Sequence, residues 1–203
     1  MNPIIGQRLQ FGLVALVVGL VVGAMPALAH DEPEVDLSFK TRFPQEIDET
    51  YFSSSFGDPR PGGRRHQGND LMAPKMTEVY AFADGVVAVI DEAWRPGRFV
   101  IIEHEEGWET YYIHLNDDNP GTDDGRADWS FTIAPGIEEG VQVKAGQLIA
   151  WVGDSGNAEG SGSHTHFELR HHNRSVDPYP YLKAAREHEL ARSERIPMDA
   201  QIF

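Results

Sequence analysis

The chain has 203 residues, a formal net charge of −15 at pH 7 and no cysteine. This length suits one domain with a hydrophobic core plus a processing segment. So acidic a chain is a poor partner for nucleic acid or anionic lipid, and we expect it to bind neither. The lack of cysteine excludes disulfides and thiolate ligands, so any metal ion would be held by His, Asp or Glu.

Residues 1–29 have the pattern of a secretory signal peptide. From Phe11 to Ala24 the chain holds only apolar residues and glycine, and Ala27-Leu28-Ala29 gives the small-x-small pattern that precedes cleavage. We predict cleavage after Ala29. The alternative is a retained anchor helix, because the apolar run approaches the length that spans a membrane. Either way we expect the rest of the chain to be exported, periplasmic or secreted and cell-wall associated, with no membrane contact after cleavage.

The mature part of the chain divides into three predicted regions. Residues 30–50 are acidic and interrupted by Pro33 and Pro44, which predicts an extended N-terminal arm. Residues 51–182 form the main domain. Residues 183–203 form a C-terminal helix and tail, with the helix predicted over 183–195 because this stretch is rich in Ala, Glu, Leu and Arg.

Short apolar runs separated by turns predict the strands of the main domain: 78–83, 86–91, 98–104, 108–114, 141–143, 147–152 and 164–170. Asp84-Gly85 predicts a two-residue hairpin between the first two runs, and Lys144–Gly146 predicts a second hairpin. Glu105–Gly107 predicts a third. Without helical periodicity between the strands, this pattern predicts an antiparallel all-β sandwich or barrel.

Residues 116–140 interrupt this series of short predicted strands with a long acidic insertion, rich in Asp, Glu, Pro and Gly. Its spacing does not match a calcium-binding loop. Loops of this length are commonly functional or solvated, which leaves two interpretations. One is a plain surface insertion. The other is a rim or lid over a substrate cleft, with Trp129 and Phe131 as contacts, because the insertion begins two residues after His114.

Three histidine patterns are candidates for a metal site. His164 and His166 lie two residues apart on a predicted strand and therefore point to the same face. His66 and Asp70 flank Gly68, which favours a loop that brings both side chains toward one point. His114 ends the predicted strand 108–114. Neither the His-x-His spacing nor the His-x-x-x-Asp spacing is specific by itself, because nine histidines make such pairs common by chance.

Together these stretches resemble the lysostaphin-like (LytM-type) zinc endopeptidases that cut peptidoglycan peptides, metallopeptidase family twenty-three. The ordered resemblance runs from about Tyr51 to Leu182. It is carried by the following stretches: Phe56–Arg60, Arg65–Pro74, Val79–Ala81, Asp84–Val86, Tyr112–Leu115, Val143–Gln147, Gly153–Gly156 and His164–Glu168.

The resemblance implies a two-sheet antiparallel β sandwich (the duplicated hybrid motif). It also implies a Zn²⁺ site formed by His66, Asp70 and His166, with His114 and His164 as catalytic histidines. We assign His164 as the base toward the zinc water and His114 to the oxyanion or proton-return role, although the two could be exchanged. The partners would be stem or bridge peptides of peptidoglycan, cut by a monomer.

Two departures from the family pattern stand out. Lys75–Glu78 replaces a common glycine-threonine-proline turn, which we interpret as a turn variant without a catalytic role, and the insertion at 116–140 is longer than usual.

Two other functions use the same fold. A non-catalytic wall-binding or amidase-activating protein typically lacks ligands that this chain retains, and a sugar-phosphotransfer domain would be cytoplasmic. Glycyl bridges and D-alanyl–diaminopimelate crosslinks both remain open as substrates.

Overall fold

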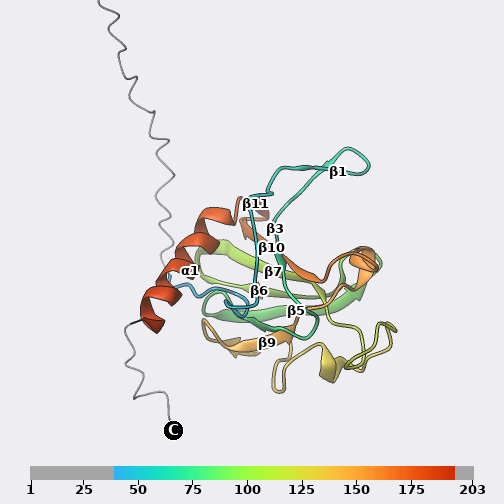
Figure 1. The fold of residues 1–203 in the computed structure, drawn as a ribbon. Coiled ribbons are helices and arrows are strands. Elements are labelled where there is room, and N and C mark those ends of the chain that lie inside the picture. Colours follow the sequence, from blue (N-terminus) through green and yellow to red (C-terminus); the bar gives the residue numbers. More distant parts are fainter. Residues whose placement is uncertain (1–38, 195–203) are drawn as a thin grey trace, which may run out of the picture. The chain divides into compact units, whose positions relative to one another are not determined.

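The computed structural model describes residues 39–194 (Figure 1). The predicted signal peptide, residues 30–38 of the predicted arm and residues 195–203 lie outside the described range. Within the described range, no helix is both long enough and apolar enough to cross a membrane.

One large antiparallel sheet organises the domain, and two small two-stranded sheets accompany it. Along the large sheet the strands lie in the order β11 (Arg174–Val176), β10 (His164–His171), β7 (Trp108–Leu115), β6 (Gly97–Glu103), β5 (Gly85–Ala93) and β8 (Gln142–Val143), and β3 (Asn69–Met72) also pairs with β10. The small sheets are β4 (Glu78–Tyr80) with β9 (Leu148–Trp151), and β1 (Pro59–Arg60) with β2 (Arg64–Arg65). Helix α1 (Tyr179–Ser193) follows at the C-terminal end. The predicted all-β antiparallel fold with one C-terminal helix is confirmed.

The core is built on aromatic side chains from neighbouring elements. Phe167 of β10 packs against Phe82, which follows β4, and edge-on against Tyr112 of β7. All three are fully buried. The Tyr112 hydroxyl accepts a 2.7 Å hydrogen bond from the backbone N–H of Phe82, so the buried phenol has a partner. Replacing Phe167 with alanine would cost about 3–5 kcal/mol, because the cavity left behind cannot fully close.

Two of the three predicted hairpins are wrong. β4 pairs with β9 and β5 pairs with β6 and β8, so neither Asp84-Gly85 nor Lys144–Gly146 closes a hairpin. Instead the chain passes from one sheet to the other at both places. The two crossing segments bond to each other, from Ala81 N–H to Gln147 O at 2.9 Å and from Gly146 N–H to Ala81 O at 2.8 Å. A turn signal fixes a bend but does not say which strands pair across it. The hairpin at Glu105–Gly107 is confirmed, because β6 pairs with β7.

Helix α1 begins at Tyr179, four residues before its predicted start. Pro180 lies in the first turn of the helix. The N–H that proline lacks would have no intrahelical partner there, so the helix tolerates it. Leu182 and Ala185 bury the inner face of α1 against the core.

The insertion at 116–140 is partly built into the domain. Ala134 and Ile137 are each 4% exposed and belong to the core, and Ile133 forms a β-bridge with Ala150. The buried guanidinium of Arg98 donates to Ala127 O at 2.9 Å, and the Trp129 ring lies over it at 4.6 Å. One face of Trp129 is therefore occupied by Arg98. The longest exposed stretch of the insertion is residues 120–126, and the role of the insertion as a rim or lid stays a prediction.

Candidate active site

The strand register brings the candidate residues to one edge of the large sheet. Asp70 on β3 stands directly opposite His166 on β10, and His166 stands opposite Ile113 on β7. His114 follows Ile113 at the end of β7. His66 precedes β3 in the loop after β2. Asp70 had been predicted to lie in a loop, but it belongs to a strand, and this pairing fixes its position against His166.

All five predicted residues lie together. Asp70 Oδ1 is 3.0 Å from His66 Nε2 and 2.9 Å from His166 Nδ1, and these two nitrogens are 2.9 Å apart. The His114 ring centroid is 5.1 Å from that of His164 and 6.1 Å from that of His166. His164 Nε2 lies 3.8 Å from Asp70 Oδ1.

The outer hydrogen bonds fix where the ring protons of the three inner residues must be. His66 Nδ1 is 2.9 Å from the carbonyl oxygen of Ser55, and His166 Nε2 is 3.0 Å from Glu168 Oε1. Oxygens of a carbonyl and an ionised carboxylate only accept, so both outer nitrogens donate. When these imidazoles are neutral, the inner nitrogens carry lone pairs that face the Asp70 carboxylate. Three acceptor atoms without a proton between them repel, and one shared cation removes the repulsion. The residues therefore fit a metal ion.

Three further side chains, Arg60, Glu168 and Arg170, hold the cluster in place, and the sequence analysis missed all three. Arg60 donates to Asp70 Oδ2 at 2.7 Å, and Arg170 donates through Nε to Glu168 at 2.8 Å. Burial alone would raise the pKa of Asp70, but the neighbouring imidazoles of His166 and His66 outweigh burial and hold the pKa well below its usual range. Glu168 was predictable in principle, because it lies two residues after His166 on the same strand face. Arg60 had no such signal.

His114 and His164 are oriented by backbone carbonyls rather than by the cluster. His114 Nδ1 donates to Ser155 O and His164 Nδ1 donates to Gly162 O, each at 2.8 Å. Each Nε2 is then a proton acceptor when the ring is neutral. Burial, together with the neighbouring charge of His164, lowers the pKa of His114 to about 4, so this ring is neutral at pH 7. His114 also has a φ of 64°, a left-handed conformation that costs energy for a residue with a side chain.

The fold and the site define a β-rich protein with a residue cluster that fits a metal ion, and comparison with known proteins gives its family. The model of peptidase family M23 matches residues 64–124 and 130–178, which is more than half of the chain. The chain belongs to this family, and the resemblance stated from the sequence is confirmed.

Similar proteins act on peptidoglycan in different ways. The chain is 32% identical over 138 residues to the DD-carboxypeptidase/endopeptidase Mpg of Neisseria meningitidis, covering 68% of this chain and 27% of that protein. It is 32% identical over 127 residues to the murein hydrolase activator EnvC of Escherichia coli, covering 63% of this chain and 26% of that protein. The chain thus spans about a quarter of the length of these relatives.

A solved structure has a similar fold and is described as a zinc-containing peptidase from Vibrio cholerae. Its TM-score is 0.54 at 30% sequence identity, covering 68% of this chain and 39% of that chain.

Proposed function

We propose that this chain is an exported zinc metalloendopeptidase that hydrolyses peptide crosslinks or bridges of peptidoglycan in the periplasm or cell wall. The observation that carries the proposal is the convergence of three possible metal-ligand atoms, from His66, Asp70 and His166, beside two further imidazoles. Similarity to a DD-carboxypeptidase/endopeptidase, to a murein hydrolase activator and to a zinc-containing peptidase supports the choice of substrate and metal.

The metal would be held by His66 Nε2, Asp70 Oδ1 and His166 Nδ1. Three protein ligands are the number that catalytic zinc sites use, with a further position left for water or substrate. When bound, zinc supplies a Lewis acid for the peptide carbonyl and lowers the pKa of water toward 7. Glu168 and Ser155 take no direct part: Glu168 orients His166, and Ser155 orients His114.

The two remaining imidazoles handle protons at Nε2. We assign His164 to accept the proton of the attacking water, because it shares a strand face with His166. We assign His114 to the oxyanion or proton-return role: it would take up at Nε2 the proton that His164 removed from the water and return it to the leaving amine. His114 can donate from Nε2 only after it has taken up a proton there, because its Nδ1 proton is committed to Ser155 O. The reverse assignment uses the same atoms.

The second candidate is a non-catalytic activator of other wall hydrolases, which the similarity to EnvC favours. The two functions differ in what the zinc-loaded protein does alone. We would incubate it with purified peptidoglycan carrying glycyl bridges, and separately with D-alanyl–diaminopimelate crosslinks, and identify products by mass. We expect cleavage of one of the two, lost on chelation and in the His114→Ala variant. No product from either, together with stimulation of a separate amidase, would favour the activator.

A further inference from the structure

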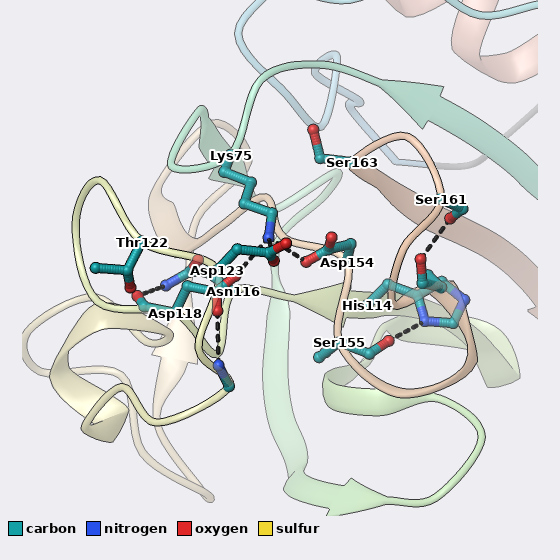
Figure 2. A network of polar contacts seen from close by, with 12 residues as sticks. Lys75, His114, Asn116, Asp118, Thr122, Asp123, Asp154, Ser155, Ser161 and Ser163 are labelled. Carbon is teal, nitrogen blue, oxygen red and sulfur yellow. Dashed lines mark hydrogen bonds and ion pairs between the residues drawn. The ribbon is translucent and has the colours of Figure 1, made fainter.

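A second polar cluster lies beside the histidines and centres on Lys75 (Figure 2). Lys75 lies in the turn between β3 and β4. Its ammonium is 2.6 Å from Asp118 Oδ2 and 2.8 Å from Asp154 Oδ1, and it also contacts Asp123. Asp118 and Asp154 are 2% and 3% exposed. The ammonium therefore bridges two buried carboxylates that come from different segments of the chain.

The Asp154 side of this bridge belongs to the segment that orients both candidate catalytic histidines. Gly153 O accepts from the backbone N–H of His164 at 2.9 Å, and Ser155 O accepts from the His114 ring at 2.8 Å. Asp154 stands between these two carbonyls. A shift of Asp154 therefore moves the acceptor that sets the direction of the His114 ring.

The Asp118 side belongs to the segment that continues from His114. Asp118 lies four residues after His114, and its Oδ1 accepts from the backbone N–H groups of Asp124 at 2.6 Å and Gly125 at 2.7 Å. Asn116 Nδ2 donates to Asp118 O at 2.8 Å. The Asp118 side chain thus organises the first turn of the insertion.

Lys75 itself is fixed to the same region through its backbone. The N–H of Met76 donates to Val152 O at 2.8 Å, and the N–H of Val152 donates to Thr77 O at 2.9 Å. The turn that carries Lys75 is thus anchored two residues before Asp154. This anchoring fixes the position of the Lys75 ammonium, which attracts the carboxylates of Asp118 and Asp154.

Electrostatics explains why the ammonium is needed. Oxygens of Asp117, Asp118 and Asp154 lie within 4.8 Å of one another. Without a cation, buried carboxylates at this separation repel strongly, because the protein interior screens charge poorly. Burial and the charge of Asp118 already raise the pKa of Asp117 to about 6. Lys75 supplies the cation from the chain itself, so this cluster is already neutralised in part.

We propose that Lys75 is a positioning residue for His114. By holding Asp118 and Asp154 together, it fixes the segment before Ser155 and the segment after His114, and so aims the His114 ring. The turn at Lys75–Glu78 is then more than a turn variant. The consequence for turnover rests on the proposed peptidase function, whereas the consequence for the His114 ring does not.

The main test is Lys75→Met in the zinc-loaded full chain, because methionine keeps much of the length and removes the charge. We expect kcat to fall about 10- to 100-fold, KM to change less, and zinc content to stay the same. The His114 Nδ1 proton should exchange with water faster in NMR spectra, since its bond to Ser155 O is weakened. The matched control is Lys144→Met, which breaks an exposed ion pair with Asp84 and should leave both readouts unchanged.

A second variant, Asp154→Asn, keeps the proposal testable if Lys75→Met does not fold, and a double-mutant cycle tests it further if both fold. Asp154→Asn should also lower kcat and speed exchange of the His114 proton, to a smaller extent. The double variant should be no worse than Lys75→Met alone, because both changes break the same link. Additive losses, or wild-type kcat and exchange in the folded single variants, would overturn the proposal. If the wild-type chain cuts no peptidoglycan, the exchange measurement still decides the role of Lys75.

Discussion

The histidine cluster and the Lys75 cluster lie side by side. Each brings together acceptor atoms that would repel one another, but the repulsion is relieved in different ways. In the first, His66, Asp70 and His166 direct three acceptor atoms at one another, with their protons on the outer side. In the second, Asp118 and Asp154 share an ammonium that the chain provides. The first cluster therefore fits a cation from solution, whereas the second already has one from the chain. Acidic groups near an active site indicate a metal only where the chain has not supplied their counter-ion.

The largest effect should come from removing a donor of the first cluster. Asp70→Ala should reduce bound zinc from about one ion per chain to near zero and abolish peptide cleavage, because two histidines alone do not make a catalytic zinc site. Asp154→Asn, in the second cluster, should keep the zinc. Metal analysis of both purified variants measures this contrast. Full zinc content in Asp70→Ala would contradict the ligand assignment.

The next largest effect concerns the two imidazoles that face the metal cluster. His114→Ala and His164→Ala should keep the zinc and lose kcat by about 10²–10⁴-fold, since each removes proton transfer. Steady-state kinetics on a crosslinked peptide, with zinc content measured in parallel, checks this. If either variant turned over substrate at close to the wild-type rate, the histidine that it replaces would not be catalytic.

The outer partner of His166 should have an intermediate effect on metal binding. Glu168→Gln keeps the shape but removes the charge that accepts from His166 Nε2, and zinc affinity should fall about 10- to 100-fold. Competition with a coloured chelator gives the affinity. Glu103→Gln, at an exposed position of β6, is the control and should bind zinc like the wild type. Equal affinities in the two variants would show that Glu168 does not tune the site.

Within the second cluster, burial should decide what each carboxylate contributes. Asp118 is 2% exposed, whereas the Asp123 side chain is 65% exposed, and both contact Lys75. Asp118→Ala should lower the free energy of unfolding by about 1–3 kcal/mol, because it leaves the N–H groups of Asp124 and Gly125 without their acceptor. Asp123→Ala should cost less than about 1 kcal/mol. Urea unfolding of both variants ranks them, and the reverse order would refute this account.

The smallest effect is a change of stability with pH. Burial and the charge of Asp118 raise the pKa of Asp117 to about 6, above its value in the unfolded chain. The folded state therefore holds this proton more tightly, and Asp117 destabilises the fold once it is ionised above pH 6. Asp117→Asn should raise the melting temperature at pH 7, and the gain should shrink as pH falls from 6 toward 4. A gain independent of pH would mean that charge is not the cause.

The candidate site was readable from the sequence because its signals are local. His164 and His166 share a face by strand alternation alone, and the surrounding motifs carry the family resemblance for His66, Asp70 and His114. Glu168 obeys the same alternation and was overlooked. β7 and β10 were also found approximately, because alternation of apolar and polar residues reports burial on one face, whereas β3, which carries Asp70, was missed.

The sequence by itself determined the antiparallel β class, the C-terminal helix and the family. These follow from short-range patterns and from the order of motifs along the chain. Only the tertiary structure decided that β4 pairs with β9, that Asp70 faces His166 from a neighbouring strand, and that Lys75 joins Asp118 to Asp154. Each of these contacts joins residues far apart in sequence. Their energy depends on burial and mutual geometry, which a local pattern does not encode.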